Sequence, residues 1–316
     1  MRKSVPLLLS ALLIGCASPY QRSDEVFLRK GAGDLLHPWK SLDEASTLHW
    51  PYAWASVAAY EDHQDPEHRT PHVPTAECPD PDVLLSTHGW IRWQEIPRLD
   101  EGGPGTLGAD MREIHLRAEV WSSEERHQVI VAFGGTAGWV DTKANARWFV
   151  SWFGETHDQY SVVSRGFKDA FLEAYRARAL QPGGKWLQTA ELVSTGHSLG
   201  AGLAQRFAYS LPPEAGRKVS TVFAFDTSPV SGKRSSPYWE QDRIGLSVFR
   251  IYNRDETLAF IRSLETWWEQ PPTENPAFVD VRYEVDWDVS RLLPVGSVKS
   301  HGLLKLACVM KQHAGL

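Results

Sequence analysis

Two kinds of hydrophobic pattern alternate along the chain: short continuous apolar runs, and longer runs with apolar residues three or four positions apart. VIVAF at 129–133 is of the first kind, which is typical of strands covered on both faces. Residues 166–179 are of the second kind and predict an amphipathic helix. The expected strands are 89–96, 114–121, 128–133, 191–194, 219–225, 246–252 and 279–285, and the expected helices are 42–60, interrupted near Pro51, 166–179, 199–210 and 300–312. Their alternation predicts an α/β fold whose mostly parallel sheet has helices on both faces.

The first residues have the pattern of an export signal. Met1-Arg2-Lys3 is basic, and the apolar run from Val5 to Gly15 is too short to span a bilayer. The run ends in Leu13-Ile14-Gly15-Cys16, which resembles the lipobox of bacterial lipoproteins. That resemblance implies removal of the signal, acylation of Cys16 and a membrane anchor, and Ala17 then favours the outer membrane. A simple secretory signal with an incidental cysteine is the alternative.

These patterns divide the chain into three parts. Residues 1–15 form the signal, residues 16–40 are polar and read as a tether, and residues 41–316 form one folded domain. Within that domain, residues 61–82 contain five prolines and many charges, so we expect a loop there. His63 and His68 in this loop belong to no metal-ligand motif, and no metal is expected.

Charge and cysteine content narrow the possible partners. The net charge is −6, and no stretch combines clustered Lys and Arg with interleaved aromatics, so no nucleic-acid partner is expected. Besides Cys16 the chain contains Cys78 and Cys308. In an exported protein these two can form a disulfide, and they are equally well explained as two buried, unpaired residues.

The stretch ELVSTGHSLGAGLAQRF at 191–207 carries the most informative motif. Gly196-His197-Ser198-Leu199-Gly200 fits G-x-S-x-G, in which a nucleophilic serine occupies a strained turn between strand and helix. Five residues with three fixed positions occur by chance, so the pattern alone is weak. An apolar run before it and a helical pattern after it supply the required context. Ser198 would then lie at a helix N-terminus, where backbone N–H groups favour developing negative charge.

A nucleophilic serine needs a base and an acid that orients the base. In the fold that presents a serine on such a strand-to-helix turn, these residues follow along the chain in the order Ser, Asp or Glu, His. Only His301 and His313 follow Ser198, and His313 lies four residues from the end, so His301 is the better base. The acid should follow a strand, and Asp255 does so in LSVFRIYNRDETLAF. Asp226 also ends a strand and is kept in reserve. A helix cap is the alternative role for Asp255.

An acyl-transfer site also needs an oxyanion hole. One donor should be the backbone N–H of Leu199. The second should follow an earlier buried strand, and VIVAFGGTAGW supplies Thr136 after two glycines.

At this point the chain resembles a class 3 lipase of the α/β-hydrolase superfamily. The resemblance rests, in order, on FGGT at 133–136, GFKDAF at 166–171, GHSLG at 196–200, FDTSP at 225–229, NRD at 253–255 and His301. It implies an α/β-hydrolase fold, the triad Ser198, Asp255 and His301, and an oxyanion hole of Thr136 and Leu199. It also implies a lid around Trp139, Trp148 and Trp152, for which core packing is the alternative.

Two positions depart from the family pattern. Gly134 stands where the family has an arginine, so whatever that arginine anchors near the oxyanion loop is either missing or supplied from elsewhere, for which Arg147 is a candidate. Asp226 stands at a family glycine and adds a charge near the active face, which also argues against Asp226 as the triad acid.

The sequence therefore predicts a serine carboxylic-ester hydrolase that acts on lipid or other esters and needs no cofactor. An acyltransferase, in which an alcohol replaces water, is an alternative with the same chemistry. A catalytically silent surface lipoprotein that binds lipid or a partner protein is an alternative of another class, but it would not require an intact Ser/Asp/His set.

Overall fold

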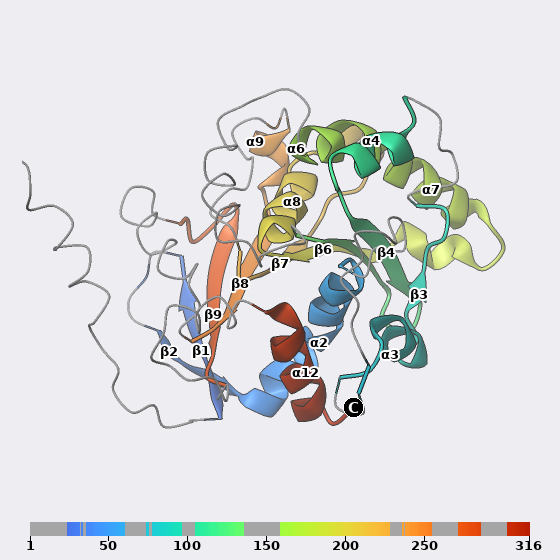
Figure 1. Ribbon diagram of the computed structural model, residues 1–316. Helices are drawn as coiled ribbons and strands as arrows, with labels where there is room; N and C mark the ends of the chain where they lie inside the picture. The colour runs from blue at the N-terminus through green and yellow to red at the C-terminus, as the bar shows by residue number, and fades with distance from the viewer. Residues whose placement is uncertain are drawn as a thin grey trace, which may run out of the picture.

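The computed structural model describes residues 24–31, 33, 36–60, 74–75, 78–96, 105–135, 159–227, 236, 238–254, 271–285 and 302–316. Within these residues the core is a nine-stranded sheet in the order β2-β1-β9-β8-β7-β6-β5-β4-β3 (Figure 1). The strands are β1 (Glu25–Lys30), β2 (His37–Ser41), β3 (Ile91–Arg92), β4 (Ala118–Ser123), β5 (Gln128–Phe133), β6 (Glu191–His197), β7 (Thr221–Phe225), β8 (Ser247–Asn253) and β9 (Ala277–Tyr283).

The centre of the sheet is parallel and its edges are antiparallel. Strands β5 to β9 pair in parallel, β4 and β3 extend one side, and β1 and β2 extend the other. The register sets Phe133 beside Gly196, His197 beside Phe225, and Phe225 beside Ile251. The carboxyl ends of β5, β6, β7 and β8 therefore meet at one edge of the sheet, where parallel α/β folds place their sites.

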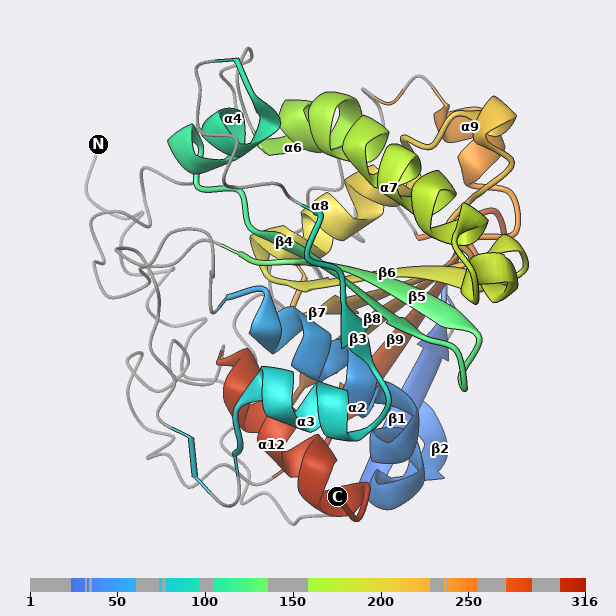
Figure 2. The same ribbon diagram turned by 90° about the vertical axis from the view of Figure 1, so that its right-hand side faces the viewer.

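Helices cover both faces of the sheet (Figure 2). Strand β5 shows why: Ile130 and Ala132 pack into the core under one helical layer, and Val129, Val131 and Phe133 into the core under the other. One layer contains α2 (Leu42–Ala58), α3 (Pro81–Thr87) and α12 (Leu303–His313). The other contains α4 (Leu107–Glu113), α6 (Gln159–Val162), α7 (Lys168–Leu180) and α8 (Leu199–Ala208), with α9 (Trp239–Asp242) on the same side.

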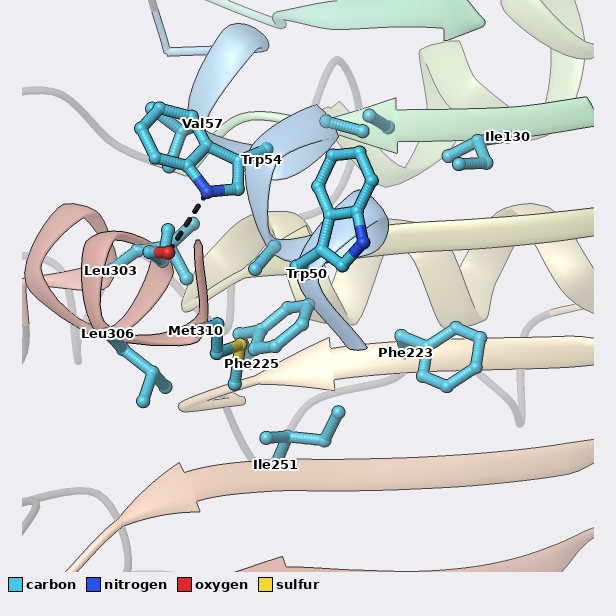
Figure 3. Close-up of a cluster of buried hydrophobic side chains, with 14 of the residues drawn as sticks. Trp50, Trp54, Val57, Ile130, Phe223, Phe225, Ile251, Leu303, Leu306 and Met310 are labelled. Atoms are coloured by element: carbon cyan, nitrogen blue, oxygen red, sulfur yellow. Dashed lines mark hydrogen bonds between the residues drawn. The ribbon is translucent and has the colours of Figure 1, made fainter. Parts of the chain in front are cut away.

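Helices α2 and α12 pack against each other in antiparallel orientation on one face of the sheet. The indole Nε1 of Trp54 donates to the carbonyl of Ala307 at 2.9 Å, and Leu303 at the start of α12 lies toward Val57 near the end of α2 (Figure 3). At the opposite ends, the Nδ1 of His313 lies 2.6 Å from an oxygen of Asp43. The N-terminus of α12 therefore lies at the C-terminus of α2.

A disulfide joins Cys78 to Cys308. It ties α12 to the segment before α3, across a sequence separation of 230 residues. The structure thus decides between the two explanations that the sequence left open, in favour of the bridge.

The structure corrects the tether expected over residues 16–40. Residues 25–30 and 37–41 are strands of the sheet, so the folded domain begins before residue 41. Val26 and Leu28 on β1 are buried, and β1 pairs with β9 from Val26 to Lys30. The apolar run Val26–Leu28 within an otherwise polar segment is the sequence signal for β1.

Helix α2 is not interrupted at Pro51. A capping box of Ser41 and Glu44 begins the helix, which then runs unbroken to Ala58. Twelve of its 17 residues are buried. This packing outweighs the cost of an interior proline, which is about 3 kcal/mol.

Two predicted strands are also shorter than expected. Strand β3 covers only residues 91–92 of the predicted 89–96. Residues 114–117 follow helix α4, so strand β4 begins at Ala118. Among the described helices, none combines the length and the apolar character needed to cross a bilayer.

Candidate active site

Ser198 occupies the turn that joins β6 to α8. Its backbone adopts φ 56° and ψ −120°, and its side chain makes no capping hydrogen bond to the helix. An ordinary N-cap serine has extended backbone angles and accepts a hydrogen bond from the first helical turn. Ser198 does neither, so its strained conformation is explained by the sharp turn and not by capping.

The two glycines of the motif are required by close backbone contacts. A Cβ on Gly196 would lie 2.4 Å from the carbonyl of Gly200, and a Cβ on Gly200 would lie 2.2 Å from the carbonyl oxygen of Phe133. Both distances are shorter than any real Cβ contact. Only glycine lets β6, α8 and the end of β5 approach this closely, as the motif predicts.

The sheet and the helix together orient this turn. The backbone N–H of Ser198 donates to the carbonyl of Phe225 at 3.0 Å, which continues the pairing with β7 one residue past the strand. Leu199 is the first residue of α8. The first N–H groups of a helix have no partner within it and favour negative charge. This strand, strained turn and helix, built on a sheet with a parallel centre, make the architecture an α/β-hydrolase fold.

Two further predicted residues directly follow described strand ends. Thr136 follows Gly135, two residues after the end of β5, and Asp255 follows Arg254, just after β8. Thr136 and Asp255 themselves lie outside the described residues. Because β5, β6 and β8 are parallel, the segments that lead to them leave the same edge of the sheet as Ser198.

The packing of α12 distinguishes between the two histidines. His301 lies outside the described residues, but its neighbour Gly302 caps the N-terminus of α12, at the C-terminal end of α2. His313 contacts Asp43 at the other end of α2, about 25 Å away along a 17-residue helix. The N-terminus of α12, at Gly302, therefore lies at the same end of α2 as the Ser198 turn, whereas His313 lies at the opposite end.

The end of α2 lies against the glycine loop that leads to Thr136. A Cβ on Gly134 would lie 2.6 Å from the carbonyl oxygen of Ala59, so no arginine fits at position 134 in this packing. The cation beside this loop is Arg117, whose guanidinium donates to the carbonyl of Tyr60 at 3.3 Å. Arg147, proposed from the sequence to replace the family arginine, lies outside the described residues.

Three polar side chains lie beside the Ser198 turn, and of these the sequence offers only Asp226 a possible catalytic role, as the reserve for the triad acid. The hydroxyl of Tyr60 is 2.8 Å from Nδ1 of His197, and Nε2 of His197 is 3.7 Å from a carboxylate oxygen of Asp226. Asp226 is only 2 % exposed. Asp226 directly follows β7, so it lies at the same edge of the sheet as Ser198, which is itself only 3 % exposed. The charge that the sequence predicts near the active face stays a prediction. No sequence spacing links these three residues, which lie just after α2, at the end of β6 and just after β7.

The remaining predicted residues are not placed. The lid candidates Trp139, Trp148 and Trp152 and the acylation candidate Cys16 lie outside the described residues. Among the residues that the structure does describe, no group of three His, Cys, Asp or Glu side chains could hold a metal ion.

Comparison with solved structures gives matches to fungal lipases at low identity. A fungal lipase in an inhibitor complex is 14% identical, over 72% of this chain and 74% of its own, with a TM-score of 0.42. The propeptide complex of the Rhizomucor miehei lipase is 13% identical, over 87% and 81%, with a TM-score of 0.44. A Yarrowia lipolytica lipase is 12% identical, over 86% and 94%, with a TM-score of 0.43. No family model and no curated protein matches the chain.

Proposed function

We propose that this protein is a serine carboxylic-ester hydrolase that acts on lipid esters. The observation that carries the proposal is the backbone of Ser198, strained and uncapped at the start of α8, between two glycines that no other residue can replace. Strain of this kind is kept where a side chain must be presented for chemistry. A serine with only a structural role would cap the helix.

In the proposed mechanism Ser198 attacks the ester carbonyl. His301 takes the hydroxyl proton and passes it to the leaving alcohol, and Asp255 holds the imidazole and offsets its charge. The backbone N–H groups of Leu199 and Thr136 stabilise the oxyanion of the tetrahedral intermediate. Water then attacks the acyl-enzyme, with His301 as the base, and releases the acid.

Three features of the described chain support these roles. Leu199 begins α8, the segments that lead to Thr136 and Asp255 leave the sheet at the edge of the nucleophile, and Gly302 lies at the end of α2. The aromatic residues Trp139, Trp148 and Trp152 would supply apolar area for an acyl chain or a lipid surface. A lipid ester, rather than a small polar ester, is therefore the proposed substrate.

A panel of p-nitrophenyl esters, triacylglycerol and phospholipid tests the proposal on wild type, Ser198→Ala and Ser194→Ala. Ser194 lies on β6, the strand that leads to Ser198, and its hydroxyl donates to the carbonyl of Ala204 at 3.0 Å, so it is a matched control. We expect turnover in wild type and Ser194→Ala, and a loss of about 10³-fold or more in Ser198→Ala. Equal turnover by wild type and Ser198→Ala on every ester would refute the proposal.

We also propose that the mature protein is exported and anchored to a bacterial membrane, with the outer membrane favoured, by acylation of Cys16. The basic, apolar and lipobox segments of residues 1–16 support this, and so does the Cys78–Cys308 disulfide, since such bridges persist in oxidising compartments. The mass of the mature N-terminus and detergent-phase partition test it. An acylated Cys16 is expected in wild type, and an N-terminus without acyl mass would contradict the anchor.

A further inference from the structure

The hydroxyl of Tyr60 lies where three parts of the candidate site meet. It follows α2, lies 2.8 Å from Nδ1 and 3.4 Å from the carbonyl oxygen of His197, and accepts a hydrogen bond from the backbone N–H of Gly135. A Cβ on Gly135 would come within 2.2 Å of this hydroxyl. Tyr60 thus touches both the residue before the nucleophile and the loop that leads to Thr136.

Helix α2 holds Tyr60 rigidly against β6. The Oγ1 of Thr195 on β6 lies 2.9 Å from the hydroxyl of Ser56 and 3.2 Å from the carbonyl oxygen of Tyr52. Both contacts lie within the last two turns before Tyr60. The tyrosine hydroxyl is therefore fixed relative to the nucleophile strand before any substrate binds.

Asp226 determines which ring nitrogen of His197 carries the proton. An imidazole has one donor and one acceptor nitrogen when neutral, and a nearby anion favours the proton on the nitrogen that faces it. Asp226 faces Nε2 at 3.7 Å, longer than a hydrogen bond but close enough for a strong field in a buried site. A proton on Nε2 leaves Nδ1 as an acceptor, so Tyr60 donates to it and keeps its lone pairs for Gly135.

We propose that Asp226, His197 and Tyr60 form a positioning network that holds the oxyanion loop against the nucleophile turn. The carboxylate selects the tautomer of His197, the imidazole fixes the hydroxyl of Tyr60, and the hydroxyl fixes the N–H of Gly135, the last described residue before Thr136. None of the three residues touches the reacting atoms. The role rests on the proposed hydrolase activity, because it acts on the oxyanion donors of that reaction.

Kinetics of Tyr60→Phe, Asp226→Asn and the double variant on a p-nitrophenyl ester test the network. Loss of a whole oxyanion donor costs about 10²- to 10³-fold, so displacement of one is expected to lower kcat about tenfold, with KM changed less than twofold. Since the three groups act in series, the kcat of the double variant should be no lower than that of the slower single variant.

Matched controls separate positioning from general destabilisation. Tyr52→Phe removes a hydroxyl from the same helix, where it donates to Gln128 at 3.0 Å, at the other end of β5. Asp242→Asn neutralises another buried carboxylate, on α9. Both are expected to keep the wild-type kcat. Two results would refute the network and leave the proposed hydrolase activity intact. Either Tyr60→Phe and Asp226→Asn also keep the wild-type kcat, or their kcat falls only in proportion to the fall in their thermal unfolding midpoints. Absence of turnover in wild type would refute the hydrolase and the network together.

The tautomer of His197 gives a second test that requires no variant in the network to be active. In ¹⁵N-correlated spectra of the native protein, the imidazole signal that disappears in His197→Gln should show the proton on Nε2. A proton on Nδ1 would overturn the arrangement.

Discussion

The backbone of Ser198 stores strain that the surrounding contacts must hold in place. A non-glycine residue with φ 56° and ψ −120° costs about 1–3 kcal/mol. That cost is offset by the hydrogen bond from its N–H to Phe225 and by the close packing of Gly196 on Gly200. The backbone contacts of the turn thus fix the position of Ser198 before any ligand binds.

Replacement of Gly196 by alanine tests this packing. The new methyl would meet the Gly200 carbonyl at 2.4 Å, and because both partners are backbone, β6 and α8 must separate. We expect a loss of at least about 2 kcal/mol in the free energy of unfolding and loss of ester turnover, measured by urea denaturation and a p-nitrophenyl assay.

Gly183→Ala is the control for this substitution. Gly183 has a φ of 85° but open space around it, so alanine there is expected to cost about 1 kcal/mol of backbone strain and to leave turnover unchanged. Full activity in Gly196→Ala would show that the turn does not depend on the close contact.

Among individual residues, the sequence predicts only those positions of the candidate site that belong to a local motif. G-x-S-x-G is enough to place Ser198 and its glycines. The side chains of Tyr60, His197 and Asp226 come from three elements, and only the pairing of β6 with β7 and the packing of α2 on β6 bring them together. A single sequence carries no signal for such a convergence.

Helix α2 joins the two halves of the candidate site. It packs on β6 through Thr195, on α12 through Trp54, and on the glycine loop through Ala59. The periodicity of its sequence predicts a helix but misplaces a break at Pro51, because burial on several sides outweighs the local cost of proline. The short strands β1 and β2 were missed for the converse reason, since pairing at the sheet edge supplies what their composition does not.

His49 on α2 makes stability depend on pH. It is 2 % exposed, its Nδ1 lies 2.7 Å from the hydroxyl of Tyr283, and burial, then the nearby Lys40, lower its pKa to about 3. The unfolded chain, with an ordinary pKa of 6.5, binds the proton more readily. Stability is therefore lost as pH falls from about 6.5 toward 3, by up to about 1.4 kcal/mol per pH unit.

Urea denaturation between pH 7 and pH 4 measures this slope in wild type and His49→Gln. In His49→Gln the slope of the free energy of unfolding against pH is expected to be smaller by the equivalent of about one proton. His37→Gln, at an exposed position on β2, serves as control and should keep the wild-type slope. If His49→Gln kept it too, the buried imidazole would not be the cause.

The molecule as a whole is one sheet with two helical layers, and its class was predictable from the alternation of strands and helices. The order of the strands was not, because pairing between distant segments leaves no local pattern. The disulfide was undecided for the same reason: only the packing of α12 beside the segment before α3 shows that Cys78 and Cys308 are close enough to bond.

Loss of that bridge should lower global stability. Cross-linking across 230 residues restricts the unfolded chain, so Cys78→Ser/Cys308→Ser is expected to reduce the free energy of unfolding by about 2–5 kcal/mol. Urea denaturation measures this difference in the free energy of unfolding. Wild type with its disulfide reduced tests the loss of the same bridge without a substitution. A double variant as stable as oxidised wild type would show that the bridge contributes nothing.

The proposed hydrolase mechanism depends most directly on Ser198 as the nucleophile. Labelling with a fluorophosphonate, followed by intact mass and peptide mapping, identifies the reactive group without any choice of substrate. We predict one adduct, on the peptide that contains Ser198, which is absent from Ser198→Ala and retained in Ser194→Ala. An unlabelled wild-type protein, or an adduct that persists in Ser198→Ala, would contradict the account.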